Sequence, residues 1–314
     1  RGKSLMIQVR PFLNSDPPAI AKIINDCCKL EATISPNLLE YTVFAKTYFS
    51  RDRFFVATIA GEVVGFAHLG SVSTDRPETR TLTISNFLVR NCDTETANAL
   101  LDSVRVFAHE HGFTTLRIGS HPNQAEYYNG VSSHFLNVGI PSTQPILPVL
   151  QDLGFATVEQ WHCLQFAPQS TQIPFTRQQM TLRRSHQIGQ VHDPEFDSFD
   201  LNAIYSHLAT SRLTLTDRLT QKEHFQLTYA CLAQSFPNWP SGGVDVVTYQ
   251  GGDTFVAEHY EFLLCELLRQ LAQTNLSPLR IHLGAQQEQA RATAEEIGFE
   301  HTITSAHIEL RLDH

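Results

Sequence analysis

The chain has 314 residues, of which 42% are hydrophobic and 18% charged, with a formal net charge of −9 and a pI near 5.9. This length suits about two domains, and the composition is that of a globular protein with a substantial core. The acidic balance argues against nucleic acid or an anionic membrane surface as a general partner, because phosphate-rich partners select clusters of Lys and Arg.

The first half of the chain alternates between strand and helix patterns. Short alternating apolar runs predict strands, and apolar residues at helical spacing predict helices. The segment FFVATIAGEVVGFAHLG, residues 54–70, combines β-branched residues with a glycine turn, which is typical of a hairpin. The predicted elements are a strand over 6–12, helices over 18–29 and 38–49, the hairpin, a strand over 82–89, a helix between an N-cap at Asp93 or Thr94 and a C-cap at Gly112, a strand over 115–119, a helix over 146–153 and a strand over 157–165.

The second half repeats this order. Residues 167–176, APQSTQIPFT, contain two prolines and small polar residues, and we expect them to form a linker. A repeat on this scale predicts two tandem domains, over 1–166 and 177–314. The predicted elements of the second half are strands over 180–183, 212–216, 224–232 and 244–249, a helix over 254–273, a strand over 279–283, a helix over 286–297 and a strand over 302–310.

The environment of the chain follows from what the sequence lacks. No stretch approaches the roughly 20 apolar residues of a membrane-spanning helix, and the first residues hold no apolar signal core. None of the six cysteines forms a C-x-x-C pair, and a chain of this size does not need disulfides. We therefore expect a cytoplasmic protein with reduced cysteines and no membrane partner.

The order of elements in each half resembles that of the GNAT superfamily of N-acyltransferases. The likeness is carried by the hairpin at 54–70, the strand and helix at 82–112, and the two segments LGF, 153–155, and IGFE, 297–300. It implies an α/β (α+β) fold of two GNAT-like domains, each a mixed, mostly antiparallel sheet flanked by helices. It also implies transfer of an acyl group from acetyl-CoA to the amine of a small molecule or peptide by direct attack.

Members of this superfamily bind acetyl-CoA where the fourth and fifth strands splay apart. Amides at the start of the following long helix cradle the pyrophosphate, since unpaired N–H groups and the positive helix end attract anions. The resemblance implies a cofactor site in the first domain, with a displaced glycine loop in the second domain as the alternative. The first site comprises Leu88, Val89, Thr94, Glu95, Thr96 and Ala97, and the alternative loop comprises Gly251, Gly252 and Asp253.

The cradle motif of the family, Gln/Arg-x-x-Gly-x-Gly/Ala, is poorly matched at both helix starts. In the first domain Cys92, Glu95 and Ala97 stand at its three defining positions, and only Ala97 fits. In the second domain none of the corresponding residues fits; they are Phe255, Glu258 and Tyr260. The residues favour another interpretation of the first helix start, in which Asp93 and Glu95 cap their own helix and offset its dipole. If only one domain has room for a cofactor between its fourth and fifth strands, we expect it to be the first, because Ala97 is smaller than Tyr260.

Catalytic residues are not marked by a strong motif. The family often places a general-acid tyrosine on the helix before Gly-Phe, where this chain has Leu150 and Ala294. Weak candidates are Tyr128 and His121, which follow the fifth strand, and Asp245, on a strand where many members keep a carboxylate base. The alternatives are that the aromatics pack down the irregular loop over 121–145 and that Asp245 is exposed at the start of its strand.

No metal site is expected from these motifs. His109-Glu110-His111 looks like a ligand fragment, but no H-E-x-x-H motif or cysteine pair accompanies it, and a solvated helix end explains it better. Two functional hypotheses therefore remain: an acetyl-CoA-dependent N-acetyltransferase, and a catalytically inactive binding or regulatory protein that has lost the pyrophosphate loop.

Overall fold

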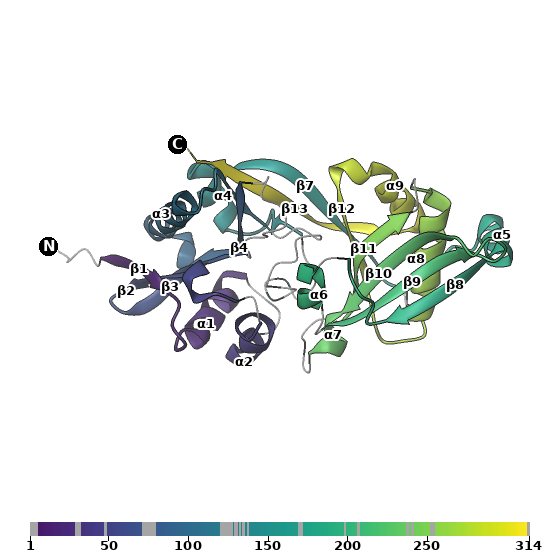
Figure 1. Cartoon of the computed structure of the whole chain (residues 1–314), viewed down its shortest axis with the longest axis horizontal. Coiled ribbons are helices and arrows are strands. Elements are labelled where there is room, and N and C mark those ends of the chain that lie inside the picture. Colours follow the sequence, from purple (N-terminus) through teal and green to yellow (C-terminus); the bar gives the residue numbers. More distant parts are fainter. Residues whose placement is uncertain are drawn as a thin grey trace.

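The computed structural model describes residues 6–28, 33–46, 49–70, 80–119, 128, 131, 133, 136, 138–168, 172–197, 199–205, 208–236, 239, 242–251 and 255–312. Within these residues the strands form one continuous thirteen-stranded mixed sheet, in the order β1-β2-β3-β4-β5-β13-β7-β12-β11-β10-β9-β8, with β6 beside β13. Figure 1 shows the two halves of the chain at opposite ends of this sheet, with helices packed on both. The expected α/β architecture of mixed sheets flanked by helices is confirmed.

The first half follows the predicted order closely. Its elements are β1 (Ile7–Pro11), α1 (Pro17–Cys28), α2 (Pro36–Leu39), a π turn (Glu40–Phe44), a 3-10 turn (Arg51–Arg53), β2 (Phe54–Ile59), β3 (Glu62–Leu69), β4 (Thr81–Val89), a 3-10 turn (Arg90–Cys92), α3 (Thr94–Glu110), β5 (Thr115–Ile118), β6 (Ile140–Pro141), α4 (Ile146–Asp152) and β7 (Ala156–Phe166).

The second half departs from the prediction at its start. Its elements are α5 (Arg177–Ser185), β8 (His186–His192), α6 (Phe199–Tyr205), β9 (Ala209–Asp217), β10 (Glu223–Cys231), α7 (Leu232–Ser235), β11 (Val244–Gly251), α8 (Ala257–Leu271), β12 (Leu279–Gly284), a 3-10 turn (Ala285–Gln287), α9 (Glu288–Ile297) and β13 (Glu300–Arg311). The strand predicted over 180–183 is wrong, because these residues lie in α5.

Capping and side-chain contacts explain why 180–183 is helical. The Thr176 side chain accepts a hydrogen bond from the Gln179 amide (3.2 Å) and so caps α5. Gln179 is buried against α8, where its amide donates to Glu261 (2.7 Å). The true edge strand, β8, is mostly exposed and carries too few apolar residues to be recognised by alternation.

The final strands of the two halves are exchanged. β13, from the end of the chain, pairs antiparallel with β5 of the first half, with Ile308 opposite Ile118. β7 pairs antiparallel with β12 of the second half, with Phe166 opposite Leu279. The two exchanged strands also pair with each other and run side by side between the halves (Figure 1). The domain limits at 166 and 177 stay a prediction; by this topology, each predicted domain lends its last strand to the other's sheet.

Apolar cores lie on both sides of the sheet. One core beneath α3 belongs to the first half, and a second around α8 belongs to the second half. A third core joins the halves, since it contains Phe54 and Ile20 from the first half with Phe236 and Trp239 from the second. No described helix combines the length and apolar character needed to cross a membrane.

Candidate functional site

The first half opens where β4 and β5 part. Their parallel ladder runs from Thr81 opposite Thr115 to Ile84 opposite Ile118, and β4 then continues to Val89 after β5 has ended. Ser85 is the extra residue of a β-bulge at this point, because the register with β3 shifts between Ile84 and Asn86. Bulges re-aim the strand that carries them. Ser85 and the residues after it therefore face a gap between two strands.

A pocket of about 90 Å³ fills this gap. Its walls come from the parting strands, from α1 and from described residues of the irregular segment before α4. The lining residues are Cys28, Ser85, Asn86, Phe87, Leu88, Ile118, Gly119, Tyr128, Ser133, Gly139, Ile140, Pro141, Gln144 and Ile146. A largely apolar pocket with a few polar groups is the usual form of a small-molecule site.

Two glycines set the shape of the pocket next to β13. Gly119 has a φ of +114°, and a Cβ added there would lie 2.8 Å from Cα of Gly139. A Cβ on Gly139 would in turn meet the Ala306 carbonyl oxygen of β13 at 2.6 Å. The chain approaches β13 this closely only because both positions lack a side chain.

Tyr128 lines this pocket and contacts a buried histidine. Its hydroxyl lies 3.2 Å from Nδ1 of His68, on β3. His68 is fully buried among the rings of Phe49 and Phe54, and this burial, with a smaller contribution from Arg53, lowers its pKa to about 3. The imidazole is therefore neutral near pH 7 and can hold the phenol by either accepting or donating a hydrogen bond.

The start of α3 is occupied by the chain's own carboxylate. Asp93 is the N-cap, and its Oδ2 accepts hydrogen bonds from the amide (2.8 Å) and hydroxyl (2.6 Å) of Thr96. Thr96 and Ala97 are buried, whereas Thr94 and Glu95 are exposed. This geometry agrees with the alternative in which acidic residues cap the helix, and it places a negative charge at the positive end of the helix dipole.

The nearest arginine does not compensate for this charge. Arg90 follows β4, but its guanidinium donates to Glu62 (2.8 Å) and to the Val63 carbonyl (3.0 Å). Of the other predicted cofactor residues, Leu88 lines the pocket. The Val89 carbonyl accepts a weak hydrogen bond from Cys27 (3.5 Å). The Arg90 guanidinium is thus engaged with residues of β3 rather than with the start of α3.

The corresponding region of the second half is filled by aromatic rings. The ladder between β11 and β12 holds only two pairs, ending at Asp245 opposite Arg280, and Val247 is the bulged residue of β11. Beyond this point a cluster of four rings packs together, with centroid separations from 5.0 to 6.3 Å: Phe225, Tyr249, Phe255 and Tyr260. Gly251 ends β11, and Gly252 and Asp253 lie outside the described residues.

Asp245 is buried, so the expectation of an exposed carboxylate is wrong. It lies 3.7 Å from Nε of the equally buried Arg280. Burial raises its pKa to about 6, while Arg280 and the Leu136 amide oppose that rise. Leu136 comes from the first half, so its contact with Asp245 joins the two halves, and Asp245 does not line the pocket beside β4.

The remaining residues singled out in the sequence differ in where they lie. Tyr128 reaches the pocket, whereas His121 lies outside the described residues. Leu150 and Ala294, at the positions where the resemblance implies a tyrosine, are fully buried in the cores. Sequence reasoning missed His68, whose one signal is a lone imidazole inside the apolar strand FAHL.

Each half therefore has a bulged strand, a short parallel ladder and a long helix in the same arrangement. The chain has a tandem GNAT fold. Its structure is similar to that of a tandem GNAT protein from the clavulanic acid biosynthesis pathway, with 10% identity, 98% of each chain covered and a TM-score of 0.67.

Two other GNAT structures share the fold. One is the GCN5-related glucosamine N-acetyltransferase region of a fungal multi-domain GH3 β-N-acetylglucosaminidase, with 11% identity, 98% of this chain and 38% of that chain covered, and a TM-score of 0.70. The other is a GCN5-related N-acetyltransferase from Sphaerobacter thermophilus, with 9% identity, 97% and 95% covered, and a TM-score of 0.58. No family model and no curated protein matches the sequence. At these identities the GNAT comparisons establish the fold.

Proposed function

We propose that the chain is a GNAT-type N-acyltransferase whose working site is the pocket between β4 and β5. The observation that carries this proposal is the Tyr128 hydroxyl, which belongs to that pocket and lies 3.2 Å from Nδ1 of the buried His68. A phenol held by a neutral imidazole is a suitable proton donor in a site that contains few other polar groups. The equivalent space in the second half is filled by the aromatic cluster.

Acetyl-CoA, when bound, would supply an activated acyl thioester. Leu88, Ile118 and Gly119 would receive the acyl end of this group, because they offer apolar walls and a close backbone approach. Ser85 and Asn86 lie on the bulged part of β4, where strand amides can polarise a carbonyl. Tyr128 would hold the proton that the departing sulfur needs, and His68 would keep its hydroxyl in place.

The pyrophosphate end of acetyl-CoA does not fit α3 well. Asp93 already binds the Thr96 amide, and Glu95 adds a second negative charge in the first turn. Each such charge costs on the order of 1 kcal/mol of binding to an anion. We therefore expect the thioester end to contribute most of the affinity. The acceptor would be an amine of a small molecule or peptide.

Calorimetric titration of the full chain tests this proposal. Acetyl-CoA should bind saturably, and S-acetyl-pantetheine, which lacks the pyrophosphate, should bind within about tenfold as tightly. Tyr128→Phe should keep this binding while thiol release with a panel of amines falls about 100-fold. Tyr260→Phe is the matched control, since it removes a phenol hydroxyl from the second half and should leave thiol release unchanged.

The second candidate function is a non-catalytic binding or regulatory module. The capping of α3 by Asp93 favours it, because this carboxylate occupies the anion-binding helix end. It predicts no heat and no thermal shift at millimolar acetyl-CoA. That result, together with no heat and no thermal shift for S-acetyl-pantetheine, would exclude the acyltransferase.

A further inference from the structure

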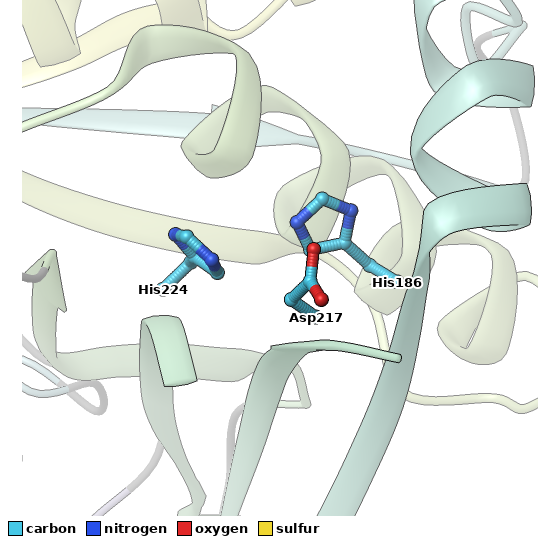
Figure 2. A group of neighbouring side chains, drawn as sticks. All are labelled: His186, Asp217 and His224. Atoms are coloured by element: carbon cyan, nitrogen blue, oxygen red, sulfur yellow. The ribbon is translucent and has the colours of Figure 1, made fainter. Parts of the chain in front are cut away.

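Three metal-ligand side chains converge at the far edge of the second half. His186 begins β8, Asp217 ends β9 and His224 lies near the start of β10. One ligand atom from each of these residues lies within 4.8 Å of the others. Figure 2 shows the two imidazoles with the carboxylate of Asp217 beside them. The cluster lies at the opposite end of the sheet from the pocket beside β4 (Figure 1).

The strand register explains why these residues meet. His186 pairs directly with Asp217 in the antiparallel ladder of β8 and β9. His224 is the extra residue of a bulge in β10, because Glu223 pairs with Thr216 and Phe225 with Leu215. A bulge turns a side chain away from strict alternation. His224 therefore lies close to His186 and Asp217, which are paired across β8 and β9.

Neighbouring hydrogen bonds orient His186. The Ser185 hydroxyl donates to the Thr181 carbonyl (3.1 Å) and lies 2.8 Å from Nδ1 of His186. With the hydroxyl proton directed at Thr181, Nδ1 of His186 can carry the ring proton and donate to Ser185. Nε2 then holds the lone pair that a metal requires.

Asp217 is held in a similar way. Its Oδ1 accepts from the amides of Leu219 (2.8 Å) and Thr220 (2.7 Å), which fixes the carboxylate on its turn. Ligands fixed by such outer hydrogen bonds are typical of built metal sites.

A third imidazole closes the cluster from the helix side. His259, in the first turn of α8, has ring centroids 5.5 Å from His186 and 5.4 Å from His224, and those two rings are 5.2 Å apart. Three imidazoles around one tetrahedral zinc, with Zn–N near 2.0 Å, would have ring centroids separated by about 5 Å. Among the described residues, Nδ1 of His259 is buried with no hydrogen-bond partner. A buried polar atom of this kind needs a partner, and an ion or a water can supply one.

We propose that His186, Asp217 and His224 bind a divalent metal ion of the zinc class, with His259, which lies outside the 4.8 Å group, as the adjacent candidate for a fourth donor. Imidazole nitrogens with one carboxylate suit Zn²⁺ and its neighbours better than Mg²⁺ or Ca²⁺, which prefer oxygen ligands. The sequence motifs suggested no metal because these ligands come from three strands and a helix. The site would tie the edge strand β8 to α8, and this inference does not depend on the acyltransferase proposal.

Zn²⁺ titration of the chelator-treated full chain tests the inference by calorimetry, with Co²⁺ absorption as a second readout of tetrahedral nitrogen and oxygen ligation. Two variants address the ligands. His224→Gln removes the imidazole on the bulge, and Asp217→Asn removes the charge but keeps Oδ1 as an acceptor for the turn. Circular dichroism of each variant checks that the fold is retained. Two controls replace other histidines: His109→Gln on α3, and His301→Gln, whose ring lies 5.4 Å from that of His162.

The expected result is one equivalent of bound Zn²⁺ with the wild-type chain, and affinity weakened about 10- to 100-fold in either ligand variant but not in the controls. Absence of stoichiometric binding by the wild-type chain would overturn the inference. So would affinity that is unchanged in folded His224→Gln, or lost instead in His301→Gln.

Discussion

The Tyr128 hydroxyl lies 3.2 Å from Nδ1 of His68, which joins a pocket residue outside the regular strands to a fully buried side chain of β3. This contact predicts that His68 acts by positioning Tyr128. His68→Phe keeps the ring volume but removes the hydrogen bond, and thiol release should fall about 10- to 100-fold with little change in KM. The double variant with Tyr128→Phe should lose no more activity than Tyr128→Phe alone. Additive losses would contradict the positioning role.

Asp93 places its charge at the start of α3, where we propose that the pyrophosphate of acetyl-CoA binds. Asp93→Ser keeps an N-cap and removes the charge, so acetyl-CoA should bind about tenfold more tightly while the free energy of unfolding changes little. Asp93→Ala also loses the cap and should destabilise the chain by about 1 kcal/mol. Urea unfolding and calorimetry measure the two effects. Asp102→Ser on the exposed part of the same helix is the control, and it should change neither quantity by as much.

The buried Asp245 should make stability depend on pH. Its pKa is raised from 3.8 to about 6, so between these values the folded chain binds more protons than the unfolded chain. The contribution is favourable below pH 4 and is lost as pH rises through 6, a difference of about 3 kcal/mol. Asp245→Asn should flatten this part of the profile of unfolding free energy against pH. Asp152→Asn, at an exposed position of α4, should leave the profile as in the wild type.

Tyr260 has a buried hydroxyl with no hydrogen-bond partner among the described residues. Burial also raises its pKa well above the usual range. Removing an unsatisfied polar atom while keeping the ring should stabilise a protein, so Tyr260→Phe should raise the free energy of unfolding by about 1 kcal/mol. Chemical denaturation measures this quantity. A lower free energy of unfolding for Tyr260→Phe would contradict the prediction, because it would show that the hydroxyl makes a stabilising hydrogen bond.

Most elements with a strong apolar period were predictable from sequence. The hairpin of β2 and β3 and the helix α3 fell where alternation and capping residues placed them. α5 did not, because its stability depends on the contact between Gln179 and α8, which local sequence does not encode. The Asp93 cap was foreseeable from its position, whereas the pairing of His68 with Tyr128 requires the tertiary fold. The strand pattern also does not decide which half β7 or β13 joins. Each of these strands follows a helix that ends before a Gly-Phe pair, so the local sequence is alike in both halves.

The exchange of β7 and β13 bears on how the chain acquires its pocket during synthesis. Ile308 pairs with Ile118, a residue of the pocket wall, and Ala306 lies against Gly139. The pocket is built mainly by the first half, yet this wall is finished only after β13, which follows all the other elements of the second half, has left the ribosome. Removal of β13 should therefore damage a site whose other parts were synthesised much earlier.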